Sequence, residues 1–197
     1  FAFALAGLWK QDIGGWIKRA IPWTLFSIAI LGLGIMMGAK WAYESLNFGG
    51  YWAWDPVENA SLVPWMILVS GLHTMIIYKN TGYSLRSTYI FLALSFIFIV
   101  YSTFLTKSGV LGESSVHAFA DIGMNGQLFL FMIVFVWLAP FLAATTDKQR
   151  IIIAGVTAAL SLATYFLAEV IPGFPLYVII AGVVTFIVLM IIQVPAV

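Results

Sequence analysis

The chain has 197 residues, of which 62% are hydrophobic and 9% are charged, and its mean hydropathy is +1.03. A soluble domain of this length carries many more charges, so the composition excludes that class and predicts an integral membrane protein that contacts the lipid bilayer. The net charge of +1 argues against nucleic acid as a partner, and the absence of cysteine excludes disulfides, thiolate metal sites and a cysteine nucleophile.

Apolar runs follow one another along the whole chain. The first, Phe1–Trp9, lacks the charged region and cleavage site of a signal peptide, so we expect it to be the end of a further helix in a chain cut from a longer protein. A helix that crosses the bilayer core needs about 20 apolar residues. The sequence therefore predicts an all-α fold, a polytopic membrane bundle of about six transmembrane helices in one domain over residues 1–197. The six expected spans are Ile21–Ala39, Ala60–Tyr78, Tyr89–Thr106, Gly126–Ala144, Ile151–Ala168 and Leu176–Val194.

The positive charges in the connecting segments are divided unequally. Only Lys40 and Lys107 fall on one face of the bundle. By the positive-inside rule the opposite face is cytoplasmic, which predicts that residues 40–59 and the loop 107–125 lie outside. In a bacterium the protein would then occupy the inner membrane, with residues 40–59 on the periplasmic side. The cations on the opposite face are Lys10, Lys18, Arg19, Lys79, Arg86, Lys148 and Arg150.

Residues 40–59, called here the tryptophan-rich segment, place aromatic rings beside a Gly-Gly pair between two spans. Tyr51, Trp52 and Trp54 lie within four residues, and this spacing suits a shelf on which a flat ligand such as a porphyrin or a quinone could stack. An interfacial belt of aromatic anchors is the alternative.

The run Asp55-Pro56-Val57-Glu58 is typical of a helix start, with Asp55 as N-cap, proline at the first position and Glu58 reaching back as in a capping box. Capping alone could explain both carboxylates. It explains Asn59 and Glu58 less fully, so a ligand-binding role stays open for these side chains.

Two histidines are the candidate metal ligands. His73 lies 17 residues beyond Pro56, up to about 25 Å down that helix, and we expect its ring to face protein because it projects on the same side as Ser70. An ionisable group within the membrane indicates function, although a bond to Ser70 or to a neighbouring helix is the alternative. His117, in the loop 107–125, could offer its imidazole to an iron or could simply be solvated.

Lys107 stands at the outer end of the third span. It could pair with an anionic group such as a propionate, or could extend to the lipid headgroups.

Two long, ordered motifs stand out between residues 31 and 141. They comprise Trp41-Ala42-Tyr43-Glu44, the run from Gly49 to Trp65, Lys107-Ser108-Gly109-Val110-Leu111 and Ser115-Val116-His117-Ala118-Phe119-Ala120. These residues resemble the cytochrome c assembly family, and most of all the haem lyase subunit of cytochrome c maturation. The related synthetase of the other bacterial and plastid system is similar too.

In that family the external tryptophan-rich segment holds haem, and histidines from external loops ligate its iron. The resemblance implies that His117 is such a ligand and that His73 ligates a separate, non-covalent b-type haem inside the membrane. The other residues that it places in cofactor binding are Gly49, Gly50, Tyr51, Trp52, Trp54, Asp55, Glu58, Asn59 and Lys107.

The resemblance also implies a reaction and its partners. The family joins haem to apocytochrome c by adding the two thiols of a Cys-x-x-Cys-His motif across the haem vinyl groups, a division of labour that suits a protein without cysteine. A haem delivery protein or other maturation subunits would be further partners. The chain departs from the family in having only two histidines where four ligands are used, in Phe48 and Tyr51 where tryptophan is common, and in the longer link 112–114.

Three other functions fit parts of the sequence. A haem exporter would pass haem on without attaching it, although the continuation Asp55-Pro56-Val57-Glu58-Asn59 favours the lyase branch. A transporter of a non-haem substrate would use the aromatic segment as a gate, but no repeated pair of broken helices supports it. A membrane scaffold would use the rings only as an aromatic belt.

Overall fold

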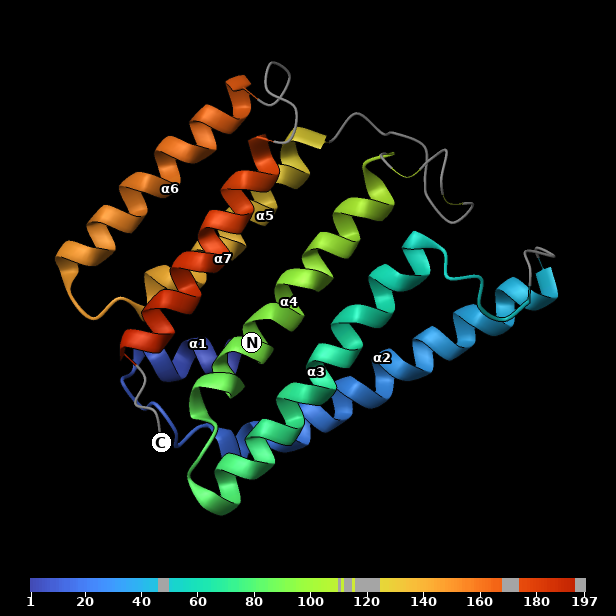
Figure 1. The fold of residues 1–197 in the computed structure, drawn as a ribbon, viewed down its shortest axis with the longest axis horizontal. Coiled ribbons are helices and arrows are strands. Elements are labelled where there is room, and N and C mark those ends of the chain that lie inside the picture. The colour runs from blue at the N-terminus through green and yellow to red at the C-terminus, as the bar shows by residue number, and fades with distance from the viewer. Residues whose placement is uncertain (46–49, 110, 112–114, 116–124, 168–173, 194–197) are drawn as a thin grey trace.

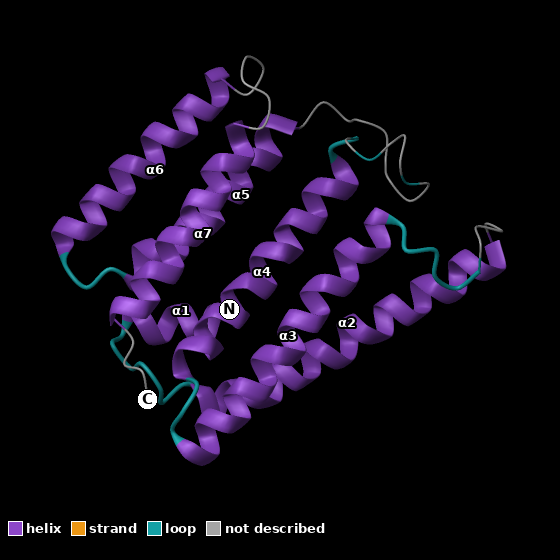
Figure 2. Cartoon of the chain, in the orientation of Figure 1, coloured by secondary structure: helices purple, strands orange, loops and turns teal. Residues whose placement is uncertain are grey.

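The computed structural model describes residues 1–45, 50–109, 111, 115, 125–167 and 174–193, and every regular element among them is a helix (Figure 2). The predicted helical class is therefore confirmed. The helices are α1 (Ala2–Trp9), α2 (Ile17–Ser45), α3 (Pro56–Thr81), α4 (Leu85–Lys107), α5 (Asn125–Ala143), α6 (Asp147–Leu167) and α7 (Phe174–Gln193).

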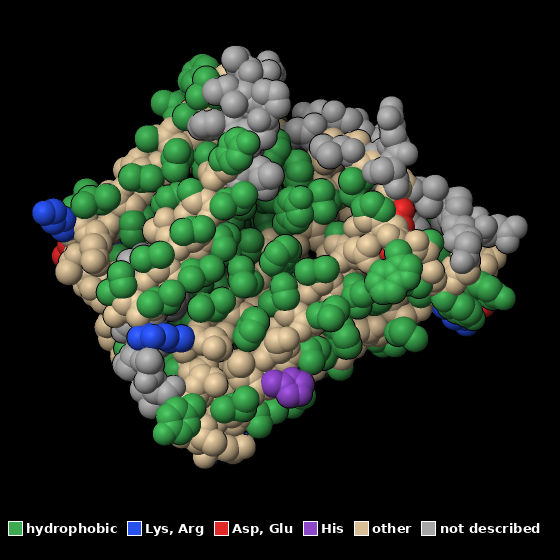
Figure 3. All heavy atoms as spheres, in the orientation of Figure 1, with side chains coloured by type: hydrophobic (Ala, Val, Ile, Leu, Met, Phe, Trp, Pro, Cys, Tyr) green, Lys and Arg blue, Asp and Glu red, His purple; other side chains and the backbone are tan. Residues whose placement is uncertain are grey.

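Four helices of the described chain are long and apolar enough to cross a membrane: α2, α3, α4 and the part of α5 from Gly126 to Ala143. This agrees with a polytopic membrane bundle, and Figure 3 shows a molecular face dominated by hydrophobic side chains. The spans expected at 151–168 and 176–194 correspond to the helices α6 and α7, whose passage through a membrane stays a prediction.

The helices form two groups that meet at α4. Helices α2, α3 and α4 lie side by side in chain order, and α5 packs against α4, α6 and α7 (Figure 1). The short α1 contacts α2, α4 and α5. Small residues allow the closest approaches, because a Cβ on Gly182 of α7 would lie 2.6 Å from Val136 of α5, and one on Gly71 of α3 would lie 3.2 Å from Leu92 of α4.

Helix α2 is longer than the expected span Ile21–Ala39 at both ends. Its 29 residues rise about 43 Å, more than the roughly 30 Å of a bilayer core, so its C-terminal turns extend past the apolar layer. Those turns carry the exposed ion pair Lys40–Glu44, with 3.7 Å between nitrogen and oxygen. The first part of the tryptophan-rich segment is therefore helical.

A buried polar contact joins the loop that precedes α2 to the N-terminal part of α4. The Trp16 indole N–H donates to the Tyr89 hydroxyl at 2.8 Å, and that hydroxyl donates to the Ile13 carbonyl at 2.8 Å. Both rings are buried and meet edge to face. Because apolar surroundings leave few other partners, this contact fixes how the loop sits on α4.

We expect Tyr89→Phe to lower the unfolding free energy by about 1–2 kcal/mol, because it removes a hydroxyl that accepts one buried bond and donates another. Thermal unfolding in detergent or nanodiscs measures this loss. Tyr83→Phe is the matched control, since Tyr83 is exposed. Equal melting temperatures for both variants would contradict the structural role of the contact.

Candidate functional site

The tryptophan-rich segment crosses from the end of α2 to the start of α3. Gly50 has φ +103°, a backbone conformation that favours glycine, and it begins the described part of the turn. The Tyr51 ring then stacks on Tyr43 of α2, with centroids 4.3 Å apart and planes 6° from parallel. This stack holds the returning chain against α2. Gly49, the other member of the predicted Gly-Gly turn, lies outside the described residues.

The first turn of α3 fixes the backbone of residues 53–55. Asp55 caps the helix by accepting from the Val57 N–H at 2.7 Å, and the Glu58 carboxylate accepts from the N–H groups of Ala53 at 2.9 Å and Asp55 at 3.2 Å. The predicted capping box is confirmed. Asn59, which capping left less explained, donates its side-chain N–H to the Trp54 carbonyl at 3.0 Å.

These bonds hold Trp54 in an unusual conformation. Its φ is +57°, in the left-handed region that costs an L-residue roughly 1–2 kcal/mol, and its ring is 71% exposed. A strained residue of this kind persists only where its neighbours fix it, and such residues cluster at functional sites. The side chains of Glu58 and Asn59 supply that restraint.

The expectation that Tyr51, Trp52 and Trp54 form one aromatic shelf is wrong. The Trp52 and Trp54 rings are 88° apart with centroids at 6.2 Å, and Tyr51 is engaged with Tyr43. A flat ligand can therefore stack on one of the two indoles and meet only the edge of the other.

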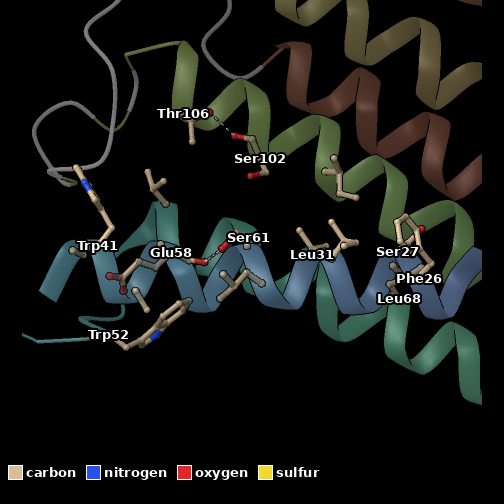
Figure 4. A pocket seen from close by; sticks show the side chains of 18 residues that line it. Phe26, Ser27, Leu31, Trp41, Trp52, Glu58, Ser61, Leu68, Ser102 and Thr106 are labelled. Carbon is tan, nitrogen blue, oxygen red and sulfur yellow. Dashed lines mark hydrogen bonds between the residues drawn. The ribbon is translucent and has the colours of Figure 1, made fainter. Parts of the chain in front are cut away.

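Trp52 lines a groove between α2, α3 and α4 that the sequence did not indicate (Figure 4). We call it the interhelical groove. Its volume is about 650 Å³, within the range usual for small-molecule sites. Phe26, Ile30 and Trp41 are among its lining residues and are all more than half exposed, so the groove is open at the surface.

The interhelical groove is apolar except for a few side chains, and most of these already have partners. Ser61 donates to the Glu58 carbonyl at 2.7 Å and Thr106 to the Ser102 carbonyl at 3.1 Å, both within their own helices. Glu58 accepts from the two N–H groups described above. Gly34 and Gly38 of α2 also line the groove, and a Cβ on either would meet no atom within 4 Å.

The indole N–H of Trp52 is buried and has no hydrogen-bond partner among the described residues. Three other indoles behave differently: the N–H of Trp16, Trp65 and Trp137 each donates within the protein, Trp65 to the Ile28 carbonyl at 3.0 Å. An unsatisfied buried donor costs about 1–3 kcal/mol and requires an explanation. A bound molecule that offers an acceptor would supply one.

A second segment reaches the same end of the molecule from α4. Gly109, with φ +74°, follows the C-cap Ser108, and the Ser115 N–H then donates to the Leu111 carbonyl at 2.8 Å. The buried Ser115 hydroxyl donates to the Asp55 carboxylate at 2.7 Å. Ser115 of the loop 107–125 therefore contacts the tryptophan-rich segment.

Contrary to our expectation, the His73 side chain is exposed among the described residues and does not face a neighbouring helix of this part of the chain. The buried residues of α3 include Gly71, Leu72 and Met75, and His73 lies about 200° around the helix from Gly71, so its side chain is exposed. Its Nδ1 lies 2.8 Å from the Val69 carbonyl, so in the neutral ring Nδ1–H donates there and Nε2 keeps its lone pair. This is the arrangement in which a histidine can ligate a metal.

The remaining predicted site residues are placed only in part. Lys107 is the last residue of α4, where its charge interacts favourably with the helix C-terminus. His117 lies outside the described residues. Within the part of the chain that the structure describes, no group of three or more histidine, aspartate or glutamate side chains could hold a metal ion. The structure adds Tyr43, Ser115, Gly34 and Gly38 to the predicted site residues. Of these, only the two glycines, four residues apart on α2, form a pattern that can be seen in the sequence.

The fold and this site define an integral membrane protein whose tryptophan-rich segment adjoins an apolar groove between three helices. The chain belongs to the cytochrome C assembly protein family, whose model matches residues 11–111. This finding confirms the resemblance from which the site residues were inferred.

Several curated proteins are similar to the chain, and their names all refer to cytochrome c-type biogenesis. The protein ccl1 of Rhodobacter capsulatus is 42% identical over 68% of this chain and 20% of its own length. The CcmF proteins of Pseudomonas fluorescens and Escherichia coli are 39% and 41% identical over 77% and 69% of this chain, and 23% and 21% of theirs. The chain thus spans about a fifth of the length of these relatives. No solved structure matches it.

We expect Glu58→Ala to raise amide hydrogen exchange of residues 53–55 at least about tenfold, because two backbone N–H groups lose a charged acceptor. Exchange followed by mass spectrometry measures this on the protein in nanodiscs. Glu44→Ala is the matched control, since it removes an exposed carboxylate that pairs only with Lys40 among the described residues. Unchanged exchange in the Glu58 variant would show that the first turn of α3 does not fix the segment.

Proposed function

We propose that the chain holds haem at the interhelical groove and the tryptophan-rich segment, and presents it for covalent attachment to apocytochrome c. The observation that carries the proposal is the open, largely apolar groove of about 650 Å³ that Trp52 lines, in which most of the polar side chains already have partners. Haem has an apolar macrocycle and anionic propionates, which fit an apolar groove with a donor near one end. The names of the relatives point to the same pathway.

In this proposal the described residues bind and orient the haem. The groove walls from α2, α3 and α4 receive apolar edges of the macrocycle, and Trp52 offers a ring edge and a hydrogen bond. The exposed Trp54 indole is the surface on which haem or the incoming apoprotein stacks. Gly50, with its positive φ, allows the turn that leads to these rings, and we expect Gly49 to contribute to cofactor binding beside it. Asp55, Glu58 and Asn59 act through the backbone that they hold.

The bond chemistry needs only the haem and the partner. Each thiol of the Cys-x-x-Cys-His motif adds across one haem vinyl group, so that a sulfur–carbon bond forms, the thiol hydrogen goes to the other vinyl carbon and nothing leaves. A chain without cysteine supplies no competing thiol. Its contribution to such a lyase reaction is the relative position of the two reactants, which alone can remove a large part of a barrier.

In this proposal each of the two histidines ligates the iron of a different haem. His117 is an axial ligand of the haem at the tryptophan-rich segment, and Lys107 pairs with a propionate. His73 ligates a b-type haem within the membrane through Nε2, which the bond from Nδ1 to the Val69 carbonyl leaves available. The tryptophan-rich segment lies on the periplasmic side of a bacterial inner membrane, where apocytochrome c and a haem delivery protein or other maturation subunits meet it.

The first test is a reduced-minus-oxidised spectrum with haem quantitation on the protein purified from membranes at the full length of its gene. We expect haem in the wild type, and a distinct part of it lost in His73→Ala and in His117→Ala. A wild type without haem under haem-replete expression would refute the proposal.

Two substitutions test the groove itself. Gly34→Leu and Gly38→Leu place side chains in its open space, and we expect each to lower haem affinity at least about tenfold without loss of thermal stability. Gly155→Leu is the matched control, because a Cβ on this α6 glycine also meets no atom within 4 Å. Unchanged haem affinity in both groove variants would remove the groove from the proposal.

A haem exporter is the second candidate, favoured by the open side of the groove, through which haem could pass without being attached. The two functions differ in their product. Expression with an apocytochrome c yields covalent cytochrome c if the protein is part of a lyase, and only haem bound to a carrier if it is an exporter.

A further inference from the structure

We infer that Asp55 is a positioning residue: its carboxylate ties the segment after α4 to the tryptophan-rich segment through Ser115, so that the two segments hold one relative position. The inference rests on the proposed function for its purpose, but the contact can be tested without haem. Asp55 and Ser115 are 60 positions apart in the chain.

The Asp55 carboxylate accepts hydrogen bonds from two different segments through one of its oxygens. Its Oδ1 accepts from the Val57 N–H at 2.7 Å, which caps α3, and from the Ser115 hydroxyl at 2.7 Å. A bond from a hydroxyl to an ionised carboxylate is among the stronger hydrogen bonds in proteins. Ser115 is 7% exposed, so water has little access to compete for it.

Capping alone does not explain why both partners are present. A serine or asparagine would cap α3 about as well as aspartate, and the cap requires nothing from the segment after α4. Ser115 nevertheless lies against Asp55: its N–H donates to the Leu111 carbonyl and its hydroxyl to the carboxylate.

The sequence neighbours of Asp55 and Ser115 indicate what the contact positions. Asp55 directly follows the strained Trp54, and Ser115 precedes the predicted ligand His117 by two residues. Two residues of chain span at most about 7 Å. The contact therefore limits the separation between the segment that carries the indoles and the segment that carries the predicted axial ligand.

The test compares variants that break the contact with variants that keep it. Ser115→Ala removes the donor, Ser115→Thr keeps it, and Asp55→Ser keeps a cap but has too short a side chain to reach both partners. Ser70→Ala is the matched control, because the Ser70 hydroxyl is exposed and bonds the Met66 carbonyl of its own helix.

Hydrogen exchange of residues 50–55 in nanodiscs is the readout that needs no haem. We expect exchange at least about tenfold faster in Ser115→Ala, near the wild-type rate in Ser115→Thr and Ser70→Ala, and no further increase when Ser115→Ala is added to Asp55→Ser. Wild-type exchange in Ser115→Ala would overturn the inference.

Haem spectra of the same variants separate positioning from stability alone. We expect Ser115→Ala to change the absorption spectrum of the bound haem and lower its affinity at least about tenfold, and Ser115→Thr to restore both. Faster exchange with an unchanged haem spectrum would make the contact merely structural and overturn the positioning role. A wild type that binds no haem would refute the proposed function, and the exchange measurement would still decide whether the contact couples the two segments.

Discussion

The site depends on the hydrogen bonds by which the first turn of α3 holds the chain that leads into it. Glu58 binds two backbone N–H groups, Asn59 binds the Trp54 carbonyl and Asp55 caps the helix. Helix α3 is anchored in turn by buried contacts with α4, so the position of the tryptophan residues is set by the bundle and not by the loop alone. This rigidity is what keeps Trp54 in a backbone conformation that it would otherwise leave.

Apolar surroundings explain why a buried group without a partner among the described residues, such as the Trp52 N–H, needs an explanation. Water cannot satisfy a polar group in an apolar groove, so hydroxyl side chains in the helices bond the carbonyl of the preceding turn, as Ser61 and Thr106 do. Trp52 lies outside the helices, so its indole N–H has no carbonyl of a preceding helical turn to bond.

The sequence predicted the helices and the capping box because each rests on local rules: apolar length for the spans, and the order Asp-Pro-x-Glu for the start of α3. It could not predict which face of α3 is buried. That helix is apolar nearly all round, and the choice depends on the close packing of Gly71 against Leu92 of α4, a contact between distant parts of the chain. His73 was therefore placed on the wrong side. The perpendicular rings of Trp52 and Trp54, the groove and the bond from Ser115 to Asp55 also depend on three-dimensional placement.

The exposed face of α2 completes the physical argument. Only a small part of this helix is buried among the described residues, since within the bundle it packs mainly on α3, yet its Gly34 and Gly38 leave open space where a larger residue would meet no obstacle. Packing within the described chain gives no reason for glycine there, because both positions are exposed and a side chain would meet no atom of the described residues within 4 Å. Glycine at these positions is explained if something other than this chain occupies the groove. The proposed haem, with its apolar macrocycle beside α2, would occupy that open space.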